Sequence, residues 1–96
     1  MKRDPRSTHH LATLSHDGRF WDAYLELEDA PGRGGPARGR IAFSPAGEAE
    51  AEPVRTATIF LEDSPQEVVA RARDFKTHQL VSLLRSWRIK RSRKAA

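Results

Sequence analysis

The chain has 96 residues, enough for one domain but not for two. It is 38% hydrophobic and 31% charged, and it has no cysteine, so disulfides, zinc–thiolate sites and thiol nucleophiles are excluded. Its unbroken apolar runs are far shorter than the ~20 residues of a membrane-spanning helix, and no secretory signal is visible. We therefore expect a cytoplasmic protein without a membrane span.

The net charge of +4 is unevenly distributed along the chain. Residues 19–84 hold eight cations and eleven acids, whereas residues 85–96 hold six cations and no acid. We expect a flexible lead over 1–9, a single domain over 10–87 and a basic tail over 88–96. A cationic segment without acids is typical of a region that contacts a polyanion. The six cations are Arg85, Arg88, Lys90, Arg91, Arg93 and Lys94.

The first two predicted strands, 10–16 and 19–28, form a hairpin around the pair Asp17-Gly18. An Asp-Gly pair between extended segments favours a two-residue type I′ turn, in which both turn positions have positive φ. This turn would place Leu14 opposite Trp21. It would also pair His16 with Arg19 and Ala12 with Ala23.

The next predicted strand, 37–44, follows a loop rich in glycine and proline at 29–36. If Leu25 lies opposite Ile41, two pairs of opposite charge also face each other across the ladder. Such pairs contribute about 0.2–1 kcal/mol each, so the apolar face and the charges indicate one register. The charge pairs are Glu26 with Arg40 and Glu28 with Arg38.

A fourth strand is predicted over 54–62, after a second polar loop. Its two faces are less distinct than those of the earlier strands, since apolar residues occur on both. Ala57, Ile59 and Leu61 lie on one face, and we place Phe60 on the other, toward the outer face of the sheet.

The C-terminal third is predicted to be helical. Ser64 can cap a helix, Pro65 suits its first position and Glu67 completes a capping box. The apolar stripe is interrupted between Phe75 and Leu80, so one long helix and two short helices both remain open. The sequence thus predicts an α+β fold, a four-stranded (possibly three-stranded) antiparallel meander with this helical segment packed on one face.

The basic tail has two interpretations. Lysine and arginine that reach phosphates release counterions and add affinity without regard to sequence, and such a run also suits acidic protein patches or anionic membranes. Alternatively, it is a solvated helix end whose cations complement the helix dipole.

The outer face of the sheet is a second candidate site. Aromatic residues beside arginines on an exposed sheet can stack on bases, but acids share this face, so we favour a surface for a protein partner or self-association, such as a homodimer. The residues concerned are Phe20, Tyr24, Arg38, Arg40 and Phe60.

Catalysis and metal binding find little support. Ser15, His16 and Asp17 have the residue types of a hydrolytic triad, but neighbours in a turn cannot point at one another. The histidines lack a clean metal-ligand spacing, and a core this thin leaves little room for a pocket of ~300 Å³. We therefore expect no metal, no cofactor and no enzyme. The sequence predicts a small accessory protein that binds nucleic acid or another polyanion through its tail.

Overall fold

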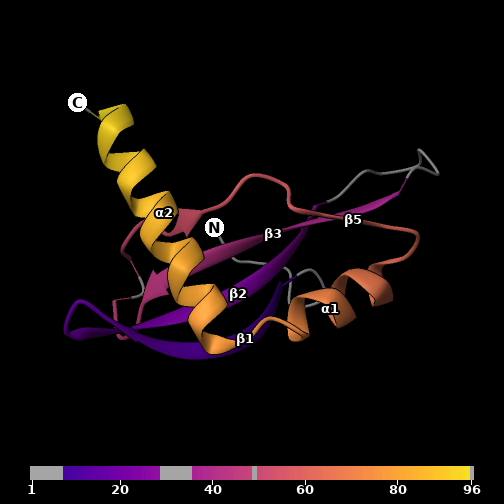
Figure 1. Cartoon of the computed structure of the whole chain (residues 1–96), viewed down its shortest axis with the longest axis horizontal. Coiled ribbons are helices and arrows are strands. Elements are labelled where there is room, and N and C mark those ends of the chain that lie inside the picture. Colours follow the sequence, from indigo (N-terminus) through magenta and orange to yellow (C-terminus); the bar gives the residue numbers. More distant parts are fainter. Residues whose placement is uncertain (1–7, 29–35, 49, 96) are drawn as a thin grey trace.

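The computed structural model of the chain describes residues 8–28, 36–48 and 50–95, with 89–95 described by their backbone alone. An antiparallel sheet carries two helices on one face, which confirms the predicted α+β class (Figure 1). The strand order is β1-β2-β3-β4, and β5 also pairs with β3. The elements are β1 (Thr8–His16), β2 (Arg19–Glu28), β3 (Ala37–Pro45), β4 (Val54–Arg55), β5 (Phe60–Glu62), α1 (Pro65–Arg73) and α2 (Thr77–Ala95).

The hairpin of β1 and β2 has the predicted turn and register. Asp17 and Gly18 have φ values of 55° and 74°, the two positive values that a type I′ turn requires. Leu14 lies opposite Trp21, and the register also pairs His16 with Arg19 and Ala12 with Ala23, as predicted. The register shifts between His10 and Ala12, which marks a β-bulge in the first half of β1.

The register of β2 and β3 is also the predicted one. Leu25 lies opposite Ile41, and Glu26 lies opposite Arg40. Glu28 and Arg38 form the next pair of that face. The apolar alternation and the charge pairs were therefore sufficient to fix this part of the sheet. Most of the predicted loop between these strands, 29–35, lies outside the described residues.

The predicted fourth strand is divided into β4 and β5, and its faces are opposite to those expected. Between β4 and β5 the pairing with β3 shifts by two residues, so the intervening segment leaves the ladder. Thr56 anchors this segment, since its backbone N–H donates to the Ile41 carbonyl at 2.9 Å and its hydroxyl accepts from the Ile41 N–H at 3.1 Å. Val54 and Phe60 are each 5% exposed in the core, whereas Ile59 and Leu61 are exposed.

The reason for this orientation lies in the packing of α1 on the sheet. Gly39 of β3 faces α1 so closely that an added Cβ would lie 2.7 Å from Cγ1 of Val68. Phe60 lies opposite Gly39 on β5, and its ring contacts the Phe75 ring edge-on at 5.6 Å between centroids. The large aromatic side chain therefore fills the core beside the glycine, where Leu61 does not reach.

The helical segment consists of two helices separated at 74–76. The Ser64 hydroxyl caps α1 by accepting from the Glu67 N–H at 3.3 Å, and it lies 3.2 Å from the Glu67 carboxylate. The break coincides with the gap in the apolar stripe before Leu80. None of the described helices is both long and apolar enough to cross a membrane.

The core lies between the sheet and the two helices. Val68 and Ala72 of α1, together with Leu80 and Leu84 of α2, pack on strand residues of the same cluster. The first and last elements of this body reach into the predicted lead and the predicted tail. β1 already begins at Thr8, within the predicted lead, and α2 continues as a helix through the predicted tail to Ala95.

Candidate nucleic-acid interface

The basic end of α2, defined here as residues 85–95, extends beyond the part of the helix that packs on the sheet. Among the residues of α2 whose side chains are described, Leu84 is the last that is fully buried, and Trp87 packs only partly against the core. Figure 1 shows the C-terminal turns of α2 pointing away from the sheet. All six candidate cations of the tail thus lie on one helical backbone that leaves the body.

The described side chains at this end behave differently from one another. Arg85 is exposed to solvent. Arg88 is turned back toward the body. The side chains of the other four candidates, Lys90, Arg91, Arg93 and Lys94, lie outside the described residues.

Arg88 contacts the tip of the β1–β2 hairpin. Its Nη1 donates to Oδ2 of Asp17 at 3.0 Å, and its guanidinium carbon lies 4.9 Å from the centre of the Trp21 ring. The His16 ring also lies near this carboxylate, with Nε2 at 3.5 Å from Oδ2, so the side chains of these two neighbours approach each other, contrary to the expectation from the turn. A guanidinium that stacks on an aromatic face and binds a carboxylate is held in one orientation. Arg88 therefore ties α2 to the hairpin at the point where the helix leaves the body.

A second arginine lies over the same indole ring. The Arg19 guanidinium carbon is 5.6 Å from the Trp21 ring centre, and Arg19 also pairs with Glu48. The Trp21 Nε1 is buried without a hydrogen-bond partner among the described residues. The Asp17-Gly18 turn could be identified from the sequence, but the contact of the Asp17 carboxylate could not, because its partner is 71 residues away.

The open face of the sheet, opposite the helices, is polar rather than continuously apolar. Phe20 is 63% exposed at the hairpin end, whereas the ring of Tyr24 is half-buried and contacts the His10 ring edge-on. Phe60, predicted to join them, faces the core instead. The expected aromatic cluster is thereby reduced to Phe20 and Tyr24, because β5 presents Leu61 to this face opposite Arg38.

An ion cluster occupies the centre of the open face. Glu26 is only 8% exposed, and its Oε1 accepts from Nε of Arg40 at 2.9 Å and from Nε of Arg55 at 3.0 Å. Burial alone would raise the pKa of Glu26, but the hydrogen bond and charge of Arg55, followed by those of Arg40, leave that pKa below its ordinary value. Arg40, a predicted contact residue, is thus engaged within the sheet.

Asp22 forms a second polar cluster on the same face. Its Oδ1 accepts from the Thr13 hydroxyl at 2.7 Å and lies 3.1 Å from His10 Nε2. The Thr13 hydrogen bond is the main cause of a lowered pKa for Asp22; partial burial opposes it, and His10 adds to it. This carboxylate would repel a phosphate, so the open face is a poor surface for nucleic acid.

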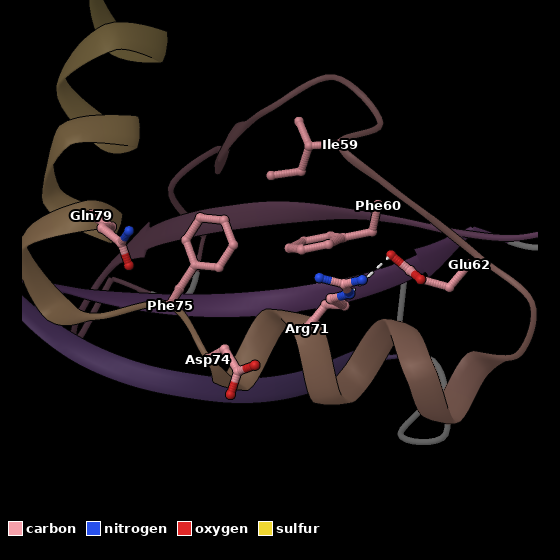
Figure 2. A pocket seen from close by; sticks show the side chains of 7 residues that line it. All are labelled: Ile59, Phe60, Glu62, Arg71, Asp74, Phe75 and Gln79. Atoms are coloured by element: carbon pink, nitrogen blue, oxygen red, sulfur yellow. Dashed lines mark ion pairs between the residues drawn. The ribbon is translucent and has the colours of Figure 1, made fainter.

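A pocket of about 380 Å³ opens between β5 and the junction of the two helices, larger than the sequence led us to expect (Figure 2). The rings of Phe60 and Phe75 line this pocket. Arg71 and Glu62 also line it, and they form an ion pair with 3.4 Å between Nε and Oε2. Its seven lining residues include the carboxylates of Glu62 and Asp74 but no hydroxyl, thiol, imidazole or amine side chain.

Among the described residues, no group of three or more His, Cys, Asp or Glu side chains could hold a metal ion. No protein-family model matches the chain, and neither the comparison with curated proteins nor that with solved structures finds a match.

Proposed function

We propose that this protein binds nucleic acid through the basic end of α2. One observation carries the proposal: residues 85–95 hold six cations and no acid on helical backbone that continues past Leu84, the last residue of α2 described as buried. An unbalanced cationic helix favours contact with a polyanion because each phosphate contact releases condensed counterions. The body has eleven acids against eight cations over 19–84. Its net negative charge makes it a less favourable surface for a polyanion than the helix end.

The composition of this end favours nucleic acid over a membrane surface. A helix that lies in a lipid interface needs an apolar face along its length. Residues 89–95 contain only Ile89 and Ala95 as apolar residues. Four of the six cations are arginines, whose planar guanidinium binds phosphate in a bidentate manner.

The length of the segment agrees with contacts to the phosphate backbone. The eleven residues 85–95 correspond to about 16 Å of helix, and duplex DNA carries a phosphate about every 1.7 Å of its axis. Because Arg88 is already bound to Asp17, we assign the phosphate contacts to the other five cations. Contacts of this type recognise the backbone, so we expect affinity without preference for base sequence.

A charge-matched pair of variants tests the proposal. Lys90, Arg91 and Arg93 are replaced together by glutamine in the test variant, and the control variant carries Arg38→Gln, Arg73→Gln and Lys76→Gln. Both lose three cations, but only the test variant loses them from the basic end. Binding is measured by fluorescence anisotropy with a labelled 20-base-pair DNA duplex at about 0.1 M salt.

We expect the test variant to lose affinity on the order of 500-fold at this salt concentration, since three phosphate contacts disappear. The control should stay within a few-fold of the unmodified chain. Equal losses in both variants would mean that net charge alone attracts DNA, and the proposal would be wrong. It would also be wrong if the unmodified chain bound vesicles of anionic lipid but not the duplex.

A further inference from the structure

β1 forms one border of the sheet. Among the described residues it pairs only with β2, so one side of its backbone has no partner strand (Figure 1). The strand is nine residues long, from Thr8 to His16. Such a strand presents a row of N–H and C=O groups that can pair with another chain.

The turn determines which residues carry these outward groups. In a hairpin with a two-residue type I′ turn, the residues that flank the turn exchange both hydrogen bonds, and every second pair repeats this pattern. Here the flanking pair is His16 with Arg19. Thr13 and Ser15 fall in the alternate pairs, opposite Asp22 and Phe20. Their backbone N–H and C=O groups therefore point outward from the edge.

This edge lacks most features that keep other edges from pairing. Soluble proteins place lysine, proline or inward charges on such strands, or bend them with bulges. Residues 8–16 contain no proline, lysine, arginine or carboxylate, and the bulge near Leu11 leaves Ala12–His16 regular. The opposite border is different, because β4 and β5 are short and interrupted.

We propose that a second copy of the chain pairs antiparallel with β1, with a two-fold axis at Leu14. Thr13 of one copy would then lie opposite Ser15 of the other, and both pairs would exchange two backbone hydrogen bonds. The same residues also face each other through their hydroxyl side chains, a favourable cross-strand combination. One continuous sheet results, with both helix layers on one side and both open faces on the other.

A second copy suits this edge better than an unrelated strand. Two identical strands pair antiparallel with closed two-fold symmetry, which ends assembly at the dimer. No like charges of lysine, arginine or carboxylates face each other, since 8–16 contains none. The opposite, interrupted border offers no equal surface for further growth.

Hydrogen exchange and sedimentation of the full chain test this inference together. In a solution dilute enough for the monomer, the Thr13 and Ser15 amide protons have no backbone acceptor among the described residues and should exchange rapidly. As protein concentration rises, sedimentation should detect a dimer and both amides should become protected, at salt concentrations up to about 1 M. A monomer at every concentration, or a dimer in which both amides exchange freely, would overturn the proposal.

Ser15→Pro removes an outward N–H while it keeps the bonds between β1 and β2, because proline is tolerated on a free strand edge. We expect a monomer with an unchanged circular dichroism spectrum, whereas Ser15→Ala should remain a dimer. Ser15→Lys, on an exposed position, serves as a second disrupting variant if the proline variant does not fold. The pairing would be contradicted if the Ser15→Lys variant formed a dimer as stable as that of the unmodified chain. It would also be contradicted if the dimer of the unmodified chain were lost at high salt, because that result would indicate association through the charged tail.

Discussion

Glu26 illustrates how single residues stabilise the open face of the sheet. Its carboxylate is nearly buried and is shared by Arg40 and Arg55. The two arginines lower its pKa in spite of burial, so folding favours the ionised form. A group whose pKa is lowered in the folded state stabilises the protein above its unfolded pKa, and this contribution is lost as the pH falls through the folded value.

Glu26→Gln should therefore destabilise the protein at neutral pH. A hydrogen bond to a charged group contributes about 1.5–3 kcal/mol to stability. We expect the free energy of unfolding to fall by about that amount. The loss should shrink as the pH falls below the ordinary glutamate value of 4.5, because the unmodified chain then loses the same contribution. Urea unfolding at about pH 7 and about pH 3 measures both effects.

Glu50→Gln provides the matched control, since Glu50 is an exposed carboxylate and the charge change is the same. It should have little effect at either pH. If Glu26→Gln destabilised the protein equally at both pH values, packing rather than ionisation would explain the role of Glu26.

At the scale of the elements, the first three strands could be predicted because several local signals agreed. The Asp17-Gly18 turn set the register of β1 and β2, while apolar alternation and charge pairs set that of β2 and β3. The fourth strand could not be oriented in the same way, because apolar residues lie on both of its faces. Its orientation depends on the space beside Gly39 and on the contact of Phe60 with Phe75, which only the packed helices create.

The helical segment also combines features that could be predicted from the sequence with a contact that could not. The capping residues were visible in the sequence and predicted the start of α1, whereas the gap in the apolar stripe left one long helix and two short helices open. The contact of Arg88 with Asp17 could not be predicted, because it joins residues 71 positions apart. The basic tail was recognised from composition alone, whereas its attachment to the hairpin emerged from the fold.

This attachment predicts an effect on binding. Asp17→Asn keeps a residue type that tolerates the positive φ of the turn, but it removes the charge that holds Arg88. An exposed ion pair contributes about 0–1 kcal/mol, so stability should change little. Arg88 becomes available for a phosphate, and affinity for duplex DNA at about 0.1 M salt should rise by roughly eightfold. Weaker binding by this variant would instead show that Asp17 positions the helix for binding.

The whole molecule separates its charges. Eleven of the thirteen acids lie within residues 19–84, and some of them pair with arginines of the body, as in the contacts of Glu26 with Arg40 and Glu62 with Arg71. The excess of positive charge lies on the last turns of α2. The backbone of this helix end leaves the body; of its two cations with described side chains, Arg85 is exposed and Arg88 contacts Asp17.

The salt dependence of DNA binding tests this account most directly. With five cations engaged, the logarithm of the affinity for duplex DNA should fall against the logarithm of the salt concentration with a slope of about −4.5. Between 50 and 200 mM salt this amounts to about a 500-fold loss, and a chain that ends at Arg88 should lose most of the slope. A slope near zero for the full chain, or an undiminished slope after truncation, would contradict binding through the basic end of α2.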